Sequence, residues 1–533
     1  MKVVQTYKDY KSPPRKLLRF FERSRNQWKA KCAEAKQLVK RLKNRVRFLE
    51  NSKALWKGRA QEVEAELVRT RAREQSLEKE LATLKEKGVG VSVVSGYAED
   101  VKPAHHTYKV GQVTLFVTLV LSAAASFRCA SQTLKIVGAF LPLPLSTPSS
   151  SAGRLWLLRL GYYKLTRPKQ QADDWVWIVD HTVQLGAEKC LVILGLRLCD
   201  WPPDHCLSYE DVEPIALYPV KHSNGTVVYQ QLEETIEKTG VPREIVGDQG
   251  SDLRSGIEQF CQVHQQTSYI YDIKHKTAAI LKHELHNDQD WLVFTKLAAQ
   301  TKQQVQQTAL AALAPPNQRS KARYMNVDRL IRWGSKVLTF LDQPAQHNSR
   351  KFDPQQIKEK LGWVIEFRES LEQWQQLLEV ITTTESFVRK QGLYHGSCRD
   401  LVKELSKFKE QSERTKRVRQ QLLTFVTTEE LKVNPDERLL GSSEVLESLF
   451  GKLKRLEQDQ AKNGFTALLL SMAAMVNTTT TEVVQKALET VPTKKILAWS
   501  KKNLGQSIQS VRKEVFAAHN KTEQKPDQLW TVV

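Results

Sequence analysis

The stretch DDWVWIVDHTVQLGAEKCLVILGLRLC (173–199) decides the fold of this chain. Both halves are rich in apolar and β-branched residues, and a short turn at Gly186 and Ala187 separates them. This pattern predicts two antiparallel strands joined as a hairpin. Asp180 interrupts the apolar run of the first strand. Because a carboxylate in a buried strand is costly without a compensating partner, this aspartate is a candidate functional residue.

The segments that follow the hairpin alternate between strand and helix patterns. They are a strand in PIALYPVKH (214–222), a helix in TVVYQQLEETIEKTG (226–240), a strand in REIVGD (243–248), a helix in SDLRSGIEQFCQVH (251–264) and a strand in TSYIYDI (267–273). The order β-β-β-α-β-α-β predicts a mixed sheet with two parallel additions wrapped by helices.

Further acidic residues follow the fourth strand, where IVGDQGSDL (245–253) contains Asp248 and Asp252. Asp248 either starts a turn or binds a metal, and Asp252 is either a cap of the next helix or a further ligand. Asp272 and His275, in YDIKHK, stand at the end of the fifth strand. They form either a polar strand end or part of a site.

The strand order and its aspartates resemble the ribonuclease-H-like core of the Asp-Asp-Glu transposases and retroviral integrases. In that family the first aspartate lies in strand one, the second lies beyond strand four, and a glutamate lies on a later helix. The matching residues are Asp180, Asp248 and a glutamate of SSEVLESLFGKLKRLEQ (442–458). The phrase SSEVLESLF also resembles a segment of the hAT transposases, which have a helical insertion in this core.

The glutamate is chosen between Glu444 and Glu447. On a helical wheel, Glu447 stands at the border of the stripe formed by leucine and phenylalanine residues, and Glu444 lies further toward solvent. We therefore prefer Glu447. Lys454 shares its face, and many transposases of this class keep a basic residue at this offset to hold DNA ends.

The resemblance implies a metal-dependent mechanism. Strands one and four are adjacent in this fold, so Asp180 and Asp248 would repel each other strongly unless a divalent cation lies between them. Oxygen ligands with open water positions suit Mg²⁺ or Mn²⁺. Two such ions, held by Asp180, Asp248 and Glu447, would support cleavage of transposon ends and joining of the 3′-hydroxyl to target DNA.

The long separation between Asp248 and Glu447 predicts a helical insertion at 274–440. Its basic run QRSKARYMNVDRLIRW (318–333) is a candidate site for the DNA backbone through Arg319, Lys321 and Arg323. The insertion also contains four tryptophans that either stack on a base or belong to the core, namely Trp291, Trp333, Trp363 and Trp374.

The N-terminal part of the chain is strongly basic. The net charge is +22, and residues 1–50 contain 16 Lys and Arg against 4 Asp and Glu. Such a charge favours a polyanionic partner, here DNA. Apolar residues recur at steps of three and four from Trp28 onwards, which predicts a coiled coil within residues 1–88, and a linker follows at 89–107. The coiled coil would pair subunits into a homodimer or a higher oligomer.

Residues 108–168 predict three short helices that fit a helix-turn-helix domain, with Arg154 and Arg159 on the last helix as DNA-binding candidates. The apolar stretch VGQVTLFVTLVLSAAASF (110–127) is interpreted as a buried helix, so no membrane association is expected. The seven cysteines include no CxxC pair and indicate reduced thiols. We therefore expect a cytoplasmic protein, associated with the nucleoid if it is bacterial.

Together these features predict an α+β protein with a coiled coil, a helix-turn-helix domain and a ribonuclease-H-like core interrupted by a helical insertion. The core is expected at 169–273 and 441–480, and a helical tail at 481–533. Two alternatives remain open for its function. One is a ribonuclease-H-like nuclease or resolvase without strand transfer, and the other is a catalytically inactive DNA-binding coiled-coil protein.

Overall fold

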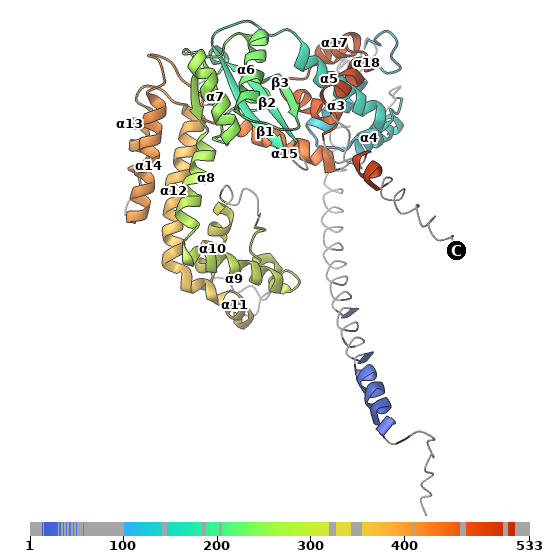
Figure 1. Ribbon diagram of the computed structural model, residues 1–533, viewed down its shortest axis with the longest axis vertical. Coiled ribbons are helices and arrows are strands. Elements are labelled where there is room, and N and C mark those ends of the chain that lie inside the picture. The colour runs from blue at the N-terminus through green and yellow to red at the C-terminus, as the bar shows by residue number, and fades with distance from the viewer. Residues whose placement is uncertain are drawn as a thin grey trace, which may run out of the picture. The chain divides into compact units, whose positions relative to one another are not determined.

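The computed structural model describes scattered residues between 13 and 57 and most of the chain from residue 101 onwards (Figure 1). The later described ranges are 101–140, 146–183, 188–201, 205–318, 324, 327–342, 354–408, 412–458, 465–504 and 510–516. The chain divides into two compact units, Met1–Val94 and Ser95–Val533, and each is described by itself.

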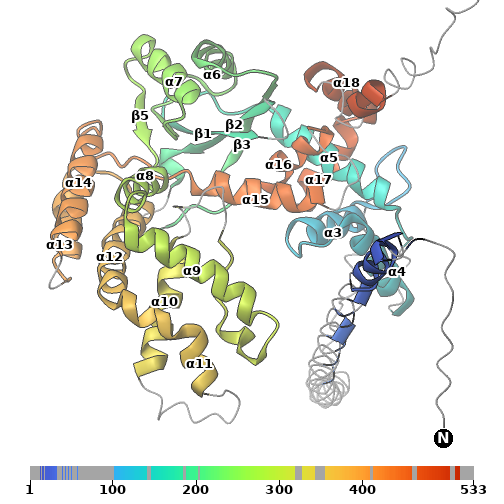
Figure 2. The ribbon, with the colours of Figure 1, turned by 60° about the horizontal axis from the view of Figure 1, so that its bottom comes forward.

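The centre of the second unit is a five-stranded mixed sheet in the order β3-β2-β1-β4-β5 (Figure 2). Its strands are β1 (Trp175–Val183), β2 (Lys189–Arg197), β3 (Glu213–Val220), β4 (Glu244–Gly247) and β5 (Ser268–Tyr271). β2 pairs antiparallel with both β1 and β3, whereas β4 pairs parallel with both β1 and β5. The predicted mixed sheet is confirmed, and β1 and β4 are direct neighbours.

The two faces of the sheet are covered by different helices (Figure 2). Trp177 and Val179 of β1 belong to the core beneath α6 (Gly225–Thr239) and α7 (Ser251–Val263). Ile178 belongs to the core on the opposite face, where α15 (Glu444–Gln458) lies. Because side chains alternate along a strand, even-numbered residues of β1 face α15 and odd-numbered ones face α6 and α7.

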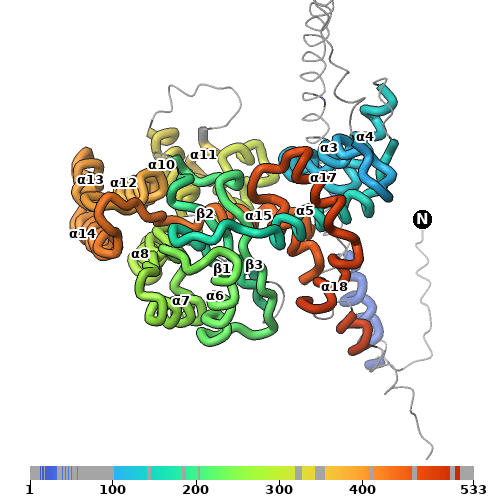
Figure 3. Tube along the Cα trace, turned by 90° about the horizontal axis from the view of Figure 1, so that it is seen from above, coloured from blue at the N-terminus to red at the C-terminus, as the bar shows by residue number. Residues whose placement is uncertain are grey.

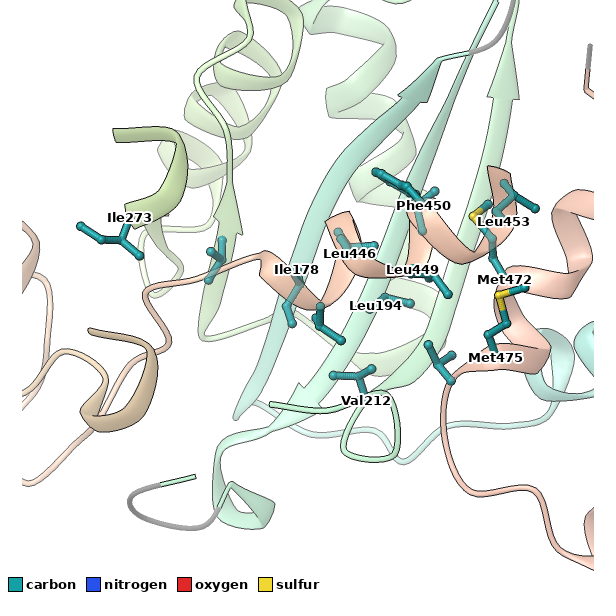
Figure 4. Close-up of a cluster of buried hydrophobic side chains, with 14 of the residues drawn as sticks. Ile178, Leu194, Val212, Ile273, Leu446, Leu449, Phe450, Leu453, Met472 and Met475 are labelled. Atoms are coloured by element: carbon teal, nitrogen blue, oxygen red, sulfur yellow. The ribbon is translucent and has the colours of Figure 1, made fainter. Parts of the chain in front are cut away.

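The apolar stripe of α15 determines how this helix lies on the sheet. Figure 4 shows Leu446 and Leu449 against Ile178 and Leu194 of the sheet. All four side chains are buried, and burial of one such side chain contributes roughly 1.5–3 kcal/mol to folding. Rotation of α15 would expose this stripe, so its packing also fixes the direction of Glu444 and Glu447.

A helical bundle packs beside the sheet and combines distant parts of the chain (Figure 3). Its helices are α3 (Val110–Leu121), α4 (Phe127–Phe140), α5 (Ser150–Thr166), α16 (Leu470–Met475), α17 (Thr481–Thr490) and α18 (Thr493–Asn503). α5 packs closely on α16, since a Cβ at Gly161 would lie 1.8 Å from the Leu470 carbonyl oxygen. Lys164 of α5 is fully buried and donates to the carbonyl oxygens of Val476 and Asn477, both at 2.8 Å.

This packing does not confirm the predicted helix-turn-helix. A recognition helix must present a free face to the major groove, but α5 contacts α3, α4, α16 and α17. Arg159 donates to the Leu488 carbonyl oxygen at the end of α17, and Arg154 is half-buried. The two predicted DNA-binding arginines are therefore partly enclosed by the bundle. The enclosing helices α16 and α17 come more than 300 residues after α5 in the chain.

The apolar stretch at 110–127 forms α3, which is buried within the bundle as predicted. Val113, Phe116 and Val117 are almost completely inaccessible to solvent. Among the described residues, none of the helices combines the length and the apolar character that a membrane span requires.

In the described part of the chain, seven α-helices connect β5 to α15. They are α8 (Ile273–Leu285), α9 (Gln289–Val305), α10 (Val327–Asp342), α11 (Pro354–Leu361), α12 (Arg368–Gln391), α13 (Ser397–Leu405) and α14 (Glu413–Glu430) (Figure 1). In the described part of 274–440 the structure contains helices and turns and one isolated bridge, between Leu393 and Leu439.

The described residues of the first unit, from 15 to 57, are helical. Apolar side chains of the predicted coiled-coil seam are exposed there, among them Trp28 at 68%, Leu42 at 54% and Val46 at 53%. Most of the predicted coiled coil at 1–88 and of the linker at 89–107 lies outside the described residues. The coiled coil therefore stays a prediction.

A buried carboxyl group binds the segment between α14 and α15 to the sheet. Glu244, at the start of β4, is completely buried, and its Oε2 accepts a hydrogen bond of 2.9 Å from the Leu440 amide. Arg243 pairs with Glu437 at 2.7 Å in the same region. Burial raises the pKa of Glu244 well above its ordinary value, which favours the protonated form of this carboxyl group in the folded protein.

Glu244→Gln should therefore change the pH dependence of stability. The wild-type side chain ionises in the unfolded chain above its ordinary pKa but keeps its proton in the folded chain, so wild-type stability is lost as pH rises. Glutamine cannot ionise, and we expect the variant to exceed wild type in free energy of unfolding at pH 8 by about 1–3 kcal/mol. The two proteins should be close at pH 4. Urea unfolding at both pH values measures this difference.

The matched control is Glu372→Gln, which neutralises an exposed glutamate of α12. It should follow the wild-type pH profile. Parallel pH profiles for Glu244→Gln and wild type would contradict a neutral Glu244 in the folded protein.

Candidate active site

Three aspartates lie on one face of the sheet, Asp180 within β1 and Asp248 and Asp272 directly after β4 and β5. Each stands two positions after a buried apolar residue of the α15 face, in the pairs Ile178 and Asp180, Val246 and Asp248, and Ile270 and Asp272. The register of β1 and β4 aligns Val179 with Gly247, so the next residues along the two strands are Asp180 and Asp248. The two aspartates are therefore neighbours, as the adjacent parallel strands require.

The surroundings of Asp180 disfavour the ionised form of its carboxyl group. Burial, and next the charge of Asp248, raise its pKa to about 7. Glu447 adds to this shift, whereas His275 and the His181 amide, which donates to Oδ1 at 2.6 Å, oppose it. The Asp180 carboxylate is thus short of compensating positive charge.

The loop that carries Asp248 is held at both ends. The Gly250 amide donates to Asp248 Oδ1 at 3.0 Å, and the Tyr269 hydroxyl donates to the Asp248 carbonyl oxygen. A Cβ at position 250 would lie 3.2 Å from Asp248 Oδ1. A glycine at this turn therefore allows the backbone to approach the carboxylate closely.

Asp272 is completely buried and accepts four hydrogen bonds. Its Oδ1 accepts from the backbone amide of His275 at 2.7 Å and from His275 Nδ1 at 2.9 Å. Its Oδ2 accepts from the backbone amide of Ser443 at 2.5 Å and from the Ser443 hydroxyl at 3.0 Å. Because α8 begins at Ile273 and α15 at Glu444, one carboxylate fixes the starts of both helices.

The bond to Asp272 also orients the His275 ring. With Nδ1 donating to Asp272, Nε2 lies 3.9 Å from Glu447 Oε1. Burial disfavours a charged His275, but the hydrogen bond and charge of Asp272, together with Glu447 and Asp180, raise the pKa of His275 to about 9. His275 is therefore a cation at neutral pH, and its second N–H faces the acidic cluster.

The two glutamates of α15 point to different partners. Glu444 forms an ion pair of 2.6 Å with Arg389 of α12. Glu447 Oε1 is buried and makes no hydrogen bond within the described part of the chain. Burial is the first cause that raises the pKa of Glu447. Glu447 rather than Glu444 thus joins Asp180 and His275.

Asp252 stands in the first turn of α7. It forms an ion pair of 2.7 Å with Lys189 and lies 3.8 Å from Nδ1 of His181. Although burial opposes it, the hydrogen bond from Lys189 lowers the pKa of Asp252 to about 2. The N-cap residue of α7 is Gly250, so Asp252 is not the cap. Sequence patterns did not identify Lys189 and His181 as its partners, because strand alternation alone does not define contacts with α7.

The cluster can be tested for its fit to a divalent metal. Among the residues that the structure describes, no three His, Cys, Asp or Glu side chains form a preassembled metal shell. The acidic cluster nevertheless has the chemistry of a cation site. Within the described part of the chain, Glu447 Oε1 accepts no hydrogen bond, and burial together with the charge of Asp248 raises the pKa of Asp180. A hard cation would relieve both conditions, and carboxylate oxygens are its preferred ligands.

A cleft with cations on its rim, here called the basic cleft, adjoins Glu447 and His275. It has a volume of about 630 Å³, and its lining combines the cations Lys274, Arg329, Arg332 and Lys454 with the carboxylates of Asp328, Glu385, Glu444 and Glu447. Lys274 pairs with Glu385 at 2.8 Å, and Arg332 lies 3.7 Å from Asp328. Lys454 is exposed, and it lies on the same helix as Glu447. The predicted backbone-binding residues Arg319, Lys321 and Arg323 lie outside the described residues.

Two of the four candidate tryptophans of the insertion, Trp291 and Trp374, are core residues, whereas Trp333 and Trp363 are partly buried against the core. All four surround Phe294, and the ring centroids of Trp291, Trp333, Trp363 and Trp374 lie 5.3–6.3 Å from that of Phe294. Trp291 and Trp374 are each 1% exposed. The indole N–H groups of the other two donate to oxygen atoms of the surrounding helices. An aromatic residue on an amphipathic helix most often packs inside, as it does here.

No family model matches the chain, and no curated protein matches its sequence. Among solved structures, the chain is similar to one described as "Drosophila P element transposase strand transfer complex". The TM-score is 0.34 and the sequence identity is 11%, over 75% of this chain and 98% of that chain. At this level of similarity the match decides neither the fold nor the function of this protein.

Asp272→Asn should destabilise the protein strongly. An asparagine amide would face the N–H and O–H donors of Ser443 or the N–H donors of His275, so at least two hydrogen bonds of the buried group would be lost. We expect the free energy of unfolding to fall by about 3–5 kcal/mol. Denaturant unfolding followed by tryptophan fluorescence measures the loss.

Ser443→Ala provides the matched control, because it removes only the hydroxyl contact to Asp272. Its expected cost is about 1 kcal/mol. If Asp272→Asn cost no more than Ser443→Ala, Asp272 would not hold the two helices together.

Proposed function

We propose that this protein is a DNA transposase that cuts the ends of a transposable element and joins them to target DNA. The observation that carries the proposal is that Asp180 and Asp248 are neighbours on β1 and after β4, and that burial together with the charges of Asp248 and Glu447 raises the pKa of Asp180. Carboxylates gathered in this way repel each other and are costly to bury. Such a cost is typical of functional sites, where it is offset by a bound cation.

Asp180, Asp248 and Glu447 would hold the metal, which we propose to be two Mg²⁺ or Mn²⁺ ions. When bound, such ions activate an attacking oxygen and stabilise the leaving oxygen of a phosphodiester. Asp180 and Asp248 would provide oxygens from adjacent strands, and Glu447 would provide the oxygen that lacks a hydrogen bond. The Gly250 amide and the His181 amide would keep the two aspartates in place.

His275 would contact the phosphate that is cut. Its Nδ1 proton is engaged by Asp272, so the Nε2 proton is free to donate to a phosphate oxygen beside Glu447. A charged donor of this kind stabilises an oxyanion more strongly than a neutral one. Asp272 would act as a positioning residue, because it touches His275 and Ser443 rather than the substrate.

The DNA would be held by its backbone. The basic cleft beside the acidic cluster contains Arg329 and Lys454, both exposed, and also Lys274 and Arg332, which pair with Glu385 and Asp328. Cations of this kind bind phosphates without regard to sequence, and a net charge of +22 attracts DNA over a longer range. The basic cleft is thus the proposed path of the duplex toward Asp180.

The N-terminal unit would bring subunits together. Transposition requires two element ends in one complex, and the exposed apolar side chains at Trp28, Leu42 and Val46 suit a coiled coil between two or more copies. We propose transposon ends and target DNA as partners and the cytoplasm, or the nucleoid of a bacterium, as the location.

The cleavage activity is tested with labelled duplexes that carry the ends of the encoding element, in Mg²⁺ and in EDTA. Asp180→Asn, Asp248→Asn and Glu447→Gln should each reduce the cleavage rate by at least about 100-fold. EDTA should abolish cleavage by wild type.

Glu444→Gln is the matched control for Glu447→Gln, because it changes the other glutamate of the same helix. It should cleave at a rate within about threefold of wild type, a change of less than 1 kcal/mol in the barrier. Loss of cleavage in Glu444→Gln but not in Glu447→Gln would overturn the assignment. If wild type showed no metal-dependent cleavage, the inactive DNA-binding alternative would be favoured.

A second experiment separates a transposase from a nuclease that only cuts. Pre-cut ends with a free 3′-hydroxyl are incubated with a supercoiled plasmid and Mg²⁺, and joined products are counted. A transposase should join these ends, and Asp180→Asn should not. Cleavage without any joined product, from ends that the protein binds, would favour the nuclease or resolvase alternative.

A further inference from the structure

A second groove lies beside the acidic cluster, across α8 from the basic cleft. Lys274 and Ala278 of α8 line the basic cleft, whereas Lys276 lines the second groove. Lys276 is about 200° around the helix from Lys274, so the two lysines project from opposite sides of α8. The second groove is completed by Gln249, Tyr271 and the exposed face of α14, and its volume is about 660 Å³.

The residues of this groove differ in kind from those of the basic cleft. Three primary amides line it, from Gln249, Gln420 and Gln421. Its floor is aromatic, with Tyr271 and Phe425 in edge-to-face contact at 6.1 Å between ring centroids. We call this site the amide groove. An apolar aromatic floor with amides at the rim can hold a planar group that has hydrogen-bonding edges, which is the chemistry of a nucleobase.

The polar groups of the amide groove are available to a ligand. In the part of the chain that the structure describes, the side chains of Gln249, Gln420 and Gln421 have no hydrogen-bonding partner within the protein. Arg417 is 66% exposed and lies 3.8 Å from Glu284. Lys276 lies over the Phe425 ring, at 5.4 Å from the centroid. A cation and several unused amides thus surround one aromatic surface.

The amide groove is directly connected to the acidic cluster along the chain. Gln249 follows Asp248, and Tyr271 precedes Asp272. A DNA strand whose phosphate lies at Asp248 would therefore have an adjacent nucleotide within reach of Gln249. On the other side of α8, the basic cleft has four cations and suits the backbone of a duplex.

We propose that the amide groove binds unpaired bases of the DNA strand that extends from the acidic cluster, while the basic cleft holds the duplex. The inference rests on the proposed function and adds to it that the DNA is unpaired on one side of the cut. The bases would lie against Tyr271 and Phe425, and their edges would face Gln420 and Gln421. Arg417 and Lys276 would contact the flanking phosphates.

The proposal is tested by the affinity of the full-length protein for three DNA molecules, with Ca²⁺ in place of Mg²⁺ to prevent cleavage. One is a blunt duplex that ends at the cut position. The second has the same duplex and an unpaired tail of four nucleotides beyond that position. The third carries an abasic tail with the same phosphates and no bases. Fluorescence anisotropy of labelled DNA gives each dissociation constant.

Wild type should bind the tailed DNA at least about fivefold more tightly than the blunt or the abasic-tailed DNA, because stacked bases add to the affinity. The double variant Gln420→Ala and Gln421→Ala should lose this preference and keep its affinity for the blunt duplex. The matched control is Gln303→Ala with Gln304→Ala, which removes two exposed amides of α9 and should keep the preference.

A charge-matched pair on α14 gives a second comparison. Arg417→Ala should weaken binding of the tailed DNA, whereas Lys416→Ala removes a charge next to it that pairs with Glu413 and should leave binding unchanged. Equal affinity of wild type for all three DNA molecules, or an equal gain from the abasic tail, would overturn the inference while leaving cleavage intact. A protein that bound none of them would instead refute the proposed function, and the inference with it.

Discussion

A single buried carboxylate, that of Asp272, holds together the elements on which the candidate active site depends. It joins the start of α8 to the start of α15 through His275 and Ser443, although Ser443 lies 171 residues further along the chain. A buried carboxylate without partners would be very costly, so its four hydrogen bonds define one arrangement of the two helices. The insertion between them can therefore be long without disturbing Glu447, because both of its ends are fixed at the sheet.

The carboxylates around Asp272 differ in how far cations or hydrogen bonds compensate their charge. Asp272, Asp252 and Glu444 are each paired with a cation or held by several hydrogen bonds. Asp180 and Glu447 are less well compensated, because burial raises the pKa of both even though His275 opposes the shift. Glu447 also lines the basic cleft. Burial of charge that is left unpaired lowers stability, and functional sites are where proteins retain such costs. Asp272, Asp252 and Glu444 therefore stabilise the fold, whereas Asp180 and Glu447 are the candidates for binding a ligand.

The strand pattern and the helical period of the sequence predicted parts of the sheet and of the acidic cluster. Apolar, β-branched runs along 173–199 predicted the hairpin, and the resemblance to the ribonuclease-H-like core implied that β1 and β4 are neighbours, which brings Asp180 next to Asp248. The helical period of α15 separated Glu447 from Glu444 by their angle to the buried stripe. These predictions depended on local repeats and on a small set of allowed sheet topologies, so they needed no knowledge of distant contacts.

The sequence by itself determined the order of strands and helices along the core and the helical character of 274–440, since these depend on neighbours in the chain. Tertiary structure alone decided which partner covers each helix. α5 has the pattern of a recognition helix, but α16 and α17 cover it and Arg159 bonds to Leu488. Asp252 stands where a cap is expected, but Lys189 binds it. An amphipathic face or a charged side chain is compatible with many partners, and only the folded chain brings one of them within contact distance.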